Sequence, residues 1–201
     1  ADLNIPLTIK STTGEDIITL DKDGSTYYAR MVTFVPGIFL KDYVKSEDML
    51  FNLGAFMARL SRAMKSFEDP AASRKFAWNL SQDDFIQHFS QELKTDEERD
   101  IVRFFLHQAQ AYHMDHGKNI PWAVIHNDGN DHNILVDDLG KTTGIIDFGD
   151  MGYSYQAAEP AVAMAYVALD AGDPLHCMGQ VLKGYHRSFQ LSEKEIKFTI
   201  Y

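Results

Sequence analysis

Two short polar stretches of the sequence contain the residue types that could carry out chemistry. In the first, His126, Asp128 and Asn133 have the spacing H-x-D-x-x-x-x-N. In the second, Asp147 opens the tripeptide Asp-Phe-Gly. Mg²⁺ prefers hard oxygen ligands, so an amide and a carboxylate from two neighbouring loops would suit this ion. A further carboxylate that stays outside the metal site could take a proton from a hydroxyl group.

This spacing is typical of the kinase catalytic loop and its metal-binding aspartate, which together move a terminal phosphoryl group to a hydroxyl. We therefore predict that Asp128 is the proton-accepting base and that Asn133 and Asp147 bind Mg²⁺. His126 is expected to brace the loop by hydrogen bonding. Either motif alone could be a chance match or a turn, but the two together, one hairpin apart and in this order, favour the functional interpretation.

Short apolar runs must position these loops. Residues 122–125, 134–136 and 143–146 are predicted strands, and "DDLGK" predicts a hairpin turn between the last two. Each polar stretch thus follows the end of a strand.

The N-terminal part is rich in β-forming residues. Residues 5–36 alternate in polarity and contain turn signals at Gly14 and Gly24, which predicts a short antiparallel meander. The tripeptide "VPG" at 35–37 ends its last strand.

The remaining sequence has mostly helical patterns. A helix is predicted from Asp48, with an apolar stripe formed by Leu50, Leu53, Met57, Leu60, Met64 and Phe67. A second runs from about 95 to 113 before Gly117, and its apolar face contains Val102, Phe105, Leu106, Ala109 and Tyr112. Residues 69–94 have a weak pattern, in which "SQDDFIQHF" could begin a short helix. Further helices are predicted at 160–169 and 178–189, so the fold class is α+β.

Composition limits the possible partners. The chain has 201 residues, of which 45% are hydrophobic, which is sufficient for one or two globular domains. Its net charge of −10 argues against nucleic acid or an anionic membrane as the main partner. No apolar run approaches the roughly 20 residues needed to cross a bilayer, and the single cysteine, Cys177, cannot form an internal disulfide. We therefore expect a cytoplasmic protein.

The stretches "HNDGNDHNILV" and "GIIDFGDMGYSYQAAEPAVAMAYVAL" resemble the aminoglycoside phosphotransferase and choline kinase superfamily, whose members share the protein-kinase fold. Within it, "NDHNIL" and "DFGDMGYSY" are most similar to hydroxylysine kinases. The resemblance implies Asp128 as the base and Asn133 and Asp147 as Mg²⁺ ligands. It also implies that Thr33, Phe34 and Val35 form the hinge whose backbone meets the purine of ATP or GTP.

The resemblance divides the chain into two parts. Residues 1–36 correspond to a remnant of the small nucleotide lobe, and residues 37–201 to the large catalytic lobe, truncated at its C-terminal end. The nucleotide-covering loop and the phosphate-binding lysine of the family have no counterpart here, because Lys10 falls after their place. We therefore expect an internal fragment of a longer kinase, with an exposed sheet edge through which the chain could self-associate.

The acceptor is expected to be a small hydroxyl compound with a positive charge. Residues 121–173 contain a single basic side chain, Lys141, against nine acidic ones, namely Asp128, Asp131, Asp137, Asp138, Asp147, Asp150, Glu159, Asp170 and Asp173. A negative cleft would concentrate a cationic acceptor. Asp150 and Glu159 are predicted to reach it, and the family resemblance points to amino-bearing acceptors, hydroxylysine first.

Two alternatives belong to other functional classes. The missing lysine and loop favour a non-catalytic binding module that retains the fold. A metal-dependent hydrolase could use His126, Asp128, His132 and Asp147 as its ligand set.

Overall fold

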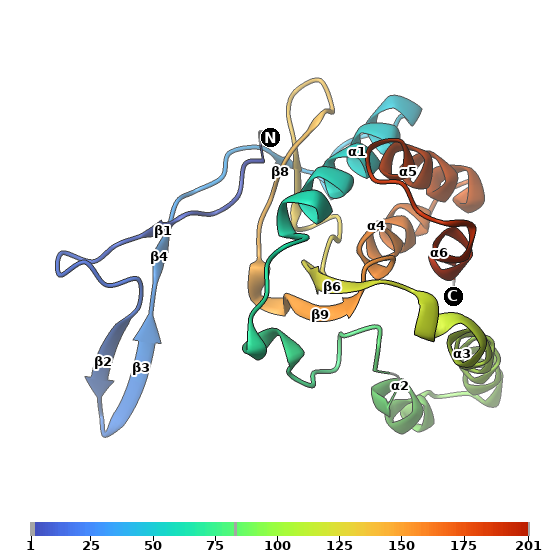
Figure 1. Ribbon diagram of the computed structural model, residues 1–201, viewed down its shortest axis with the longest axis horizontal. Coiled ribbons are helices and arrows are strands. Elements are labelled where there is room, and N and C mark those ends of the chain that lie inside the picture. Colours follow the sequence, from blue (N-terminus) through green and yellow to red (C-terminus); the bar gives the residue numbers. More distant parts are fainter. Residues whose placement is uncertain (1–2, 83, 201) are drawn as a thin grey trace.

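In the computed structural model of the protein, residues 3–82 and 84–200 are described, and a long N-terminal arm of strands projects from a mostly helical body (Figure 1). The arm contains β1 (Thr8–Ile9), β2 (Ile18–Lys22), β3 (Ser25–Ala29) and β4 (Met31–Val32). The strands of the body are β5 (Ile38–Phe39), β6 (Trp122–Ile125), β7 (Ile134–Val136), β8 (Thr142–Ile145) and β9 (Gly152–Tyr155). Its helices are α1 (Glu47–Met64), α2 (Asp84–Phe89), α3 (Asp96–His116), α4 (Ala158–Ala168), α5 (Pro174–Ser188) and α6 (Glu193–Phe198).

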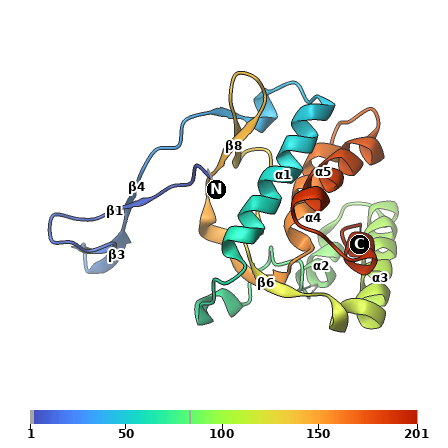
Figure 2. The same cartoon turned by 45° about the horizontal axis from the view of Figure 1, so that its top comes forward.

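The arm differs from the predicted meander in how its strands pair. The hairpin of β2 and β3 forms as expected, but β1 pairs antiparallel with β4 and not with β2. The reason is a turn at residues 11–15, where the backbone N–H of Ser11 donates to the carbonyl oxygen of Glu15 at 2.9 Å. This turn separates β1 from β2, so the β2–β3 hairpin continues from the end of the β1–β4 pair in Figure 1, and in Figure 2 the whole arm lies to one side of the body.

Two small antiparallel sheets in the body position the polar loops, which follow the ends of their strands. One has the strand order β5-β7-β8, and the other pairs β6 with β9. The predicted strands at 122–125 and 134–136 have these bounds, and the third strand spans 142–145. The predicted hairpin between β7 and β8 is therefore confirmed, whereas β5 and β9 were not predicted.

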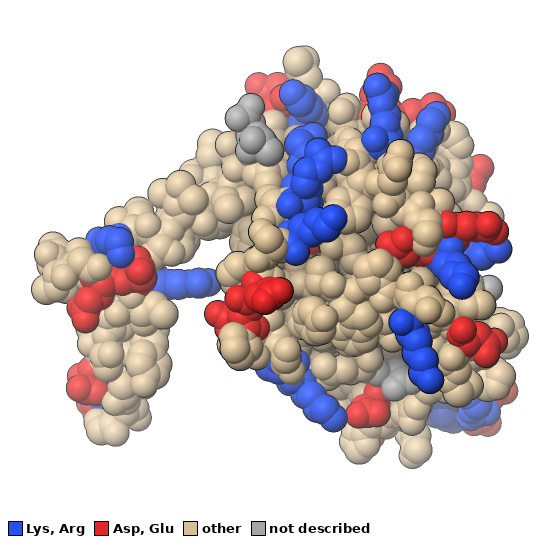
Figure 3. All heavy atoms as spheres, in the orientation of Figure 1, with Lys and Arg blue, Asp and Glu red and all other residues tan. Residues whose placement is uncertain are grey.

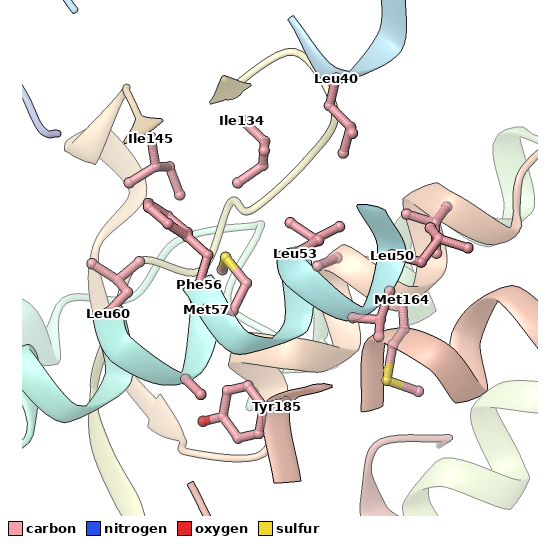
Figure 4. Packing of buried hydrophobic residues seen from close by; sticks show 14 of the residues in the cluster. Leu40, Leu50, Leu53, Phe56, Met57, Leu60, Ile134, Ile145, Met164 and Tyr185 are labelled. Carbon is pink, nitrogen blue, oxygen red and sulfur yellow. The ribbon is translucent and has the colours of Figure 1, made fainter. Parts of the chain in front are cut away.

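Helix α1 forms the centre of the core. Ser46 caps it, since its side chain accepts the backbone N–H of Met49, and the first five residues of the predicted stripe are buried. The helix ends at Met64, so Phe67 lies beyond the stripe and is 46% exposed. In Figure 4, side chains from α1 pack against Ile134 and Ile145 on one side, and Tyr185 of α5 lies on the other.

Glycines allow α1 and α5 to approach closely. A Cβ atom at Gly54 would lie 1.9 Å from the carbonyl oxygen of Val181, and one at Gly184 would lie 2.0 Å from that of Phe51. Any larger side chain at either position would therefore force the two helices apart.

Helix α3 is less buried than its periodicity predicts. Thr95 and Glu98 form a capping box at its start, but none of its residues is fully buried. Leu106 and Ala109 line a cavity beneath the helix, while Phe105 is 66% exposed. The helix lies at the edge of the body and only a narrow side of it meets other elements, so the prediction for Phe105 is wrong.

The last helices agree with prediction in place but not in every boundary. Helix α4 begins two residues before Pro160, and α5 begins at Pro174, capped by Asp173. Asp83, in the predicted short helix, lies outside the described residues, as does Tyr201. None of the helices in the described ranges is long and apolar enough to cross a membrane.

Candidate active site

The loop between β6 and β7, residues 126–133, is anchored by His126, whose ring is fully buried. Its Nε2 lies 3.0 Å from the carbonyl oxygen of Ile146, and its Nδ1 lies 3.3 Å from the backbone nitrogen of Asp128. A carbonyl only accepts and a backbone N–H only donates, so Nε2 bears the proton and Nδ1 accepts. Burial lowers the pKa of this imidazole to about 4. His126 is therefore a neutral brace with both ring nitrogens occupied.

A second anchor of this loop is Glu159 in the first turn of α4. Its Oε2 accepts the backbone N–H of His126 at 2.7 Å, and the side chain is fully buried. Burial raises the pKa of this carboxyl to about 7. The prediction that Glu159 reaches the acceptor is wrong, because the start of α4 directs this side chain beneath the loop and away from solvent.

Asp128 lies at the outer side of the loop and is half-buried. Its Oδ1 accepts the side-chain N–H of Asn130 at 2.7 Å, and its Oδ2 accepts that of Asn133 at 2.6 Å. Two amide donors therefore hold this carboxylate, one on each oxygen. Each carboxylate oxygen can accept more than one hydrogen bond, so the group can still receive a proton from a bound hydroxyl.

Asn133 and Asp147 are brought together by the antiparallel pairing of β7 with β8, because Asn133 precedes β7 and Asp147 follows β8. The N–H of Ile146 donates to the carbonyl oxygen of Asn133 at 3.0 Å, which ties the residue before Asp147 to the metal-ligand candidate of the first loop. Asp147 is exposed, has a left-handed φ of 61° and accepts the backbone N–H of Gly149 on Oδ1 at 3.2 Å.

This pair of side chains fits a hard divalent cation. Both hydrogen bonds of the Asn133 amide nitrogen go to Asp128, so its carbonyl oxygen Oδ1 faces away from the base. Asp147 has a second carboxylate oxygen, Oδ2, for which the described residues supply no hydrogen bond. One amide and one carboxylate oxygen are ligands that Mg²⁺ accepts while retaining waters.

A cavity of about 530 Å³ separates the arm from the body, and Figure 3 shows the hollow between them. Its lining includes Thr33, Phe34 and Val35 on one side and Asp147 on the other. The rest of the lining is mostly apolar, namely Pro6, Thr8, Arg30, Val32, Gly37, Phe39, Leu135, Ile146 and Phe148. The structure thus brings the predicted hinge and a predicted metal ligand to one cavity.

Within the predicted hinge, the backbone N–H and the hydroxyl of Thr33 are both used in hydrogen bonds to Leu7. Its backbone N–H donates to the carbonyl oxygen of Leu7, and its hydroxyl accepts the N–H of Leu7, both at 2.9 Å. Among the described residues, no backbone partner is found for the N–H groups of Phe34 and Val35. The backbone hydrogen bonds of the described residues therefore leave these two N–H groups unused.

Asp150 lies at the surface three residues after Asp147, but it has a cationic neighbour. The guanidinium of Arg74 lies 4.0 Å from its carboxylate, donates to the carbonyl oxygen of Gly149 and stacks over the ring of Phe76. The side chain of Asp150 remains 38% exposed, so it can still meet a solute.

Comparison with known proteins supplies the family. Residues 6–192, nearly the whole chain, match the phosphotransferase enzyme family. The chain belongs to this phosphotransferase family. Hydroxylysine kinase of Mus musculus is 28% identical over 193 residues, which cover 89% of this chain and 51% of that protein. Hydroxylysine kinase of Xenopus laevis is also 28% identical, over 180 residues that cover 83% of this chain and 48% of that protein. The chain thus spans about half the length of the curated relatives it matches.

Solved structures show the same fold. The microcompartment-associated aminopropanol kinase matches with a TM-score of 0.72 at 18% identity, over 99% of this chain and 64% of that one. The amicoumacin kinase in complex with AMP-PNP and Ca²⁺ matches with a TM-score of 0.66 at 17% identity, over 94% and 58%. The predicted kinase-like α+β fold of this phosphotransferase is confirmed, as is its resemblance to hydroxylysine kinases.

Two residues of this phosphotransferase site were missed by sequence reasoning. Asn130 lies inside the first polar stretch, and an amide two residues after the candidate base was a usable signal. Arg74 could not be found in this way, because it lies in the segment 69–94, which has no periodic pattern, and contacts a loop 75 residues later.

The four residues proposed as metal ligands in the hydrolase alternative do not lie together in the structure. His126 is buried against Ile146, and the ring of His132 faces solvent beside Asp131 at 3.0 Å. Across the described ranges, no group of three or more histidine, cysteine, aspartate or glutamate side chains is placed to hold a metal ion. The alternative set of His126, Asp128, His132 and Asp147 is therefore not assembled.

Proposed function

We propose that the full-length protein is a small-molecule kinase, which transfers the terminal phosphoryl group of ATP or GTP to a hydroxyl of an amino-bearing acceptor. The observation that carries this proposal is the Asp128 carboxylate, held through both oxygens by Asn130 and Asn133, with Asn133 bonded through its backbone to Ile146, the residue before Asp147. A positioned base next to two hard oxygen ligands is the arrangement that phosphoryl transfer to a hydroxyl requires.

Each residue then has one task. Asp128 accepts the proton of the acceptor hydroxyl as the oxygen attacks phosphorus. Asn133 Oδ1 and the carboxylate of Asp147 would hold Mg²⁺, which offsets charge on the phosphates when bound. His126 and Glu159 keep the loop in place from beneath.

The nucleotide would occupy the cavity between arm and body. Its apolar lining suits the faces of a purine, and the backbone N–H groups of Phe34 and Val35 suit the polar edge. Asp147 lines the same cavity, which supports our proposal that the metal-binding end of the nucleotide lies near this residue. Competition between ATP and GTP in a turnover assay identifies the preferred donor.

The acceptor is proposed to be cationic, with hydroxylysine as the first candidate. The named relatives, a hydroxylysine kinase and an aminopropanol kinase, support an amino-bearing acceptor. The local electrostatics support it less strongly than the acidic count suggests, because Glu159 is buried and Arg74 lies beside Asp150. Asp150 remains the acidic side chain proposed to meet the ammonium group.

A substrate screen tests this part of the proposal. Hydroxylysine, choline, ethanolamine and an aminoglycoside are compared with neutral sugars and hydroxy acids as acceptors for the full-length protein. Preference for a neutral or anionic acceptor would contradict the electrostatic argument and leave the phosphotransferase assignment intact.

The exchange Asp128→Asn tests the base. It retains the shape of the side chain and removes the proton acceptor, so turnover should fall about 10² to 10⁴-fold while nucleotide affinity changes little. Asp138→Asn is the matched control, because Asp138 is exposed in the β7–β8 turn. Turnover of Asp128→Asn within a few-fold of wild type would rule out this base. Nucleotide binding by the wild type without turnover of any acceptor would instead support the binding-module alternative.

We also propose that the arm can self-associate. Its strands expose large apolar side chains, including Tyr28 at 77% and Met31 at 65%, on two-stranded sheets with free edges. Sedimentation at increasing protein concentration measures this association, and a strictly monomeric protein would refute it.

A further inference from the structure

Both polar atoms of the Asn130 side chain form hydrogen bonds within the loop of residues 126–133. Its amide nitrogen donates to Asp128 Oδ1 at 2.7 Å, and its amide oxygen accepts the backbone N–H of His132 at 2.8 Å and that of Asn133 at 3.1 Å. The orientation of this amide follows from chemistry, because a backbone N–H can only donate and an ionised carboxylate can only accept.

These bonds join two functional parts of the loop through one rigid amide group. On one side Asn130 holds the carboxylate of Asp128, and on the other it holds the backbone of Asn133, a proposed metal ligand. Asn133 returns to the base from the opposite side, through its own amide nitrogen to Asp128 Oδ2 at 2.6 Å. Rotation of the carboxylate would therefore break a bond on each oxygen.

The loop around Asn130 has little freedom to compensate for a lost bond. The carbonyl oxygen of Asn130 accepts the backbone N–H of Asn133 and of Ile134, at 3.1 and 3.2 Å. The carbonyl oxygen of the next residue, Asp131, accepts the N–H of Lys41 at 3.1 Å. Backbone bonds thus fix the loop on both sides, and the side chain of Asn130 sets the angle of the carboxylate.

We propose that Asn130 is a positioning residue for phosphoryl transfer, which aims the free lone pairs of Asp128 at the acceptor hydroxyl and sets the separation of base and metal ligand. This inference rests on the proposed kinase function. A base displaced by about 1 Å can lose about 10²-fold in rate, so the effect of Asn130 should appear in kcat.

The exchange Asn130→Asp separates the two tasks of the side chain. A carboxylate can still accept the N–H groups of His132 and Asn133, but it cannot donate to Asp128 and repels it at this distance. We expect kcat to fall about 10- to 100-fold, with KM for nucleotide and acceptor within about 3-fold of wild type. The control is Asn119→Asp, which makes the same change of charge at an exposed position in the turn Gly117–Asn119.

A double-mutant cycle then tests whether Asn130 acts through the base. In a protein that already carries Asp128→Asn, the added exchange Asn130→Asp should leave the residual rate within about 2-fold, because no base remains to be aimed. A merely structural role would lower kcat by the same factor in both backgrounds. Nucleotide binding by each variant, measured separately, shows that the loop is still folded.

The outcomes distinguish this inference from the proposed function. If Asp128→Asn retains turnover, the kinase assignment of the base fails. If Asp128→Asn loses turnover but Asn130→Asp behaves like Asn119→Asp, or its effect is equal in both backgrounds, only the role of Asn130 is overturned.

Discussion

Replacing Glu159 with glutamine should change how the stability of the protein depends on pH. Glu159 is fully buried under the loop of residues 126–133, where its carboxyl accepts the backbone N–H of His126, and burial raises its pKa from 4.5 to about 7. Glutamine has almost the same shape and an amide oxygen that can accept the same N–H. The exchange therefore removes the ionisation while retaining the acceptor.

The magnitude follows from the raised pKa. Below pH 4.5 the carboxyl is protonated in both the folded and the unfolded state, so stability is not reduced. Between pH 4.5 and 7 the folded protein retains a proton that the unfolded chain releases, so the free energy of unfolding falls as the pH rises. The loss is complete above pH 7 and amounts to about 3 kcal/mol, because one pKa unit is worth roughly 1.4 kcal/mol.

The assay compares urea unfolding of the wild-type and Glu159→Gln full-length proteins at pH values from 4.5 to 8. The free energy of unfolding of the wild type minus that of the variant should fall by about 3 kcal/mol across this range. The titration of His126 is present in both proteins and cancels in the difference. Glu68→Gln, at an exposed position, reports the general effect of removing one carboxyl. A difference that stays constant within about 1 kcal/mol would refute the buried, proton-retaining state of Glu159.

Two other exchanges test the metal site and the packing of the core. Asp147→Ala should weaken binding of the magnesium–nucleotide complex and change the Mg²⁺ dependence of the rate, and an unchanged Mg²⁺ titration would contradict the role of Asp147. Gly54→Ala should lower the free energy of unfolding by about 1 to 3 kcal/mol or more, because its Cβ atom would lie 1.9 Å from the carbonyl oxygen of Val181. Gly179→Ala on α5, the helix that packs against α1, is the control, since a Cβ atom there meets no atom within 4 Å. Equal unfolding midpoints for both variants would show that the helices are not as close as described.

Much of the site was predictable because it is local in sequence. Asp128 and Asn133 belong to one loop of eight residues, and short apolar runs on either side of it predict the strands that end there. The β7–β8 hairpin then brings Asp147 next to Asn133 through a connection of only a few residues. A pattern of residue types at fixed spacing therefore contained both the candidate ligands and the elements that position them.

The helical stripe of α1 was predictable for a related reason. Residues that recur every three to four positions lie on one face of a helix whatever the helix packs against, so Leu53 and Met57 were predicted as buried. The same pattern did not determine how deep a helix is buried. Phe105 of α3 is exposed because α3 lies at the edge of the body, and no property of its own sequence encodes that place.

The sequence by itself determined which candidate residues lie in the two loops, the order of the loops and the strands that end at them. Only the tertiary structure decided which side chains meet across long separations. Glu159 follows Asp128 by 31 positions and was expected in the cleft, yet the packing of α4 buries it under His126. Arg74 reaches Asp150 from a segment without periodicity. Local patterns report the preferences of neighbouring residues, whereas burial and charge pairing depend on which surfaces are pressed together when the whole chain folds.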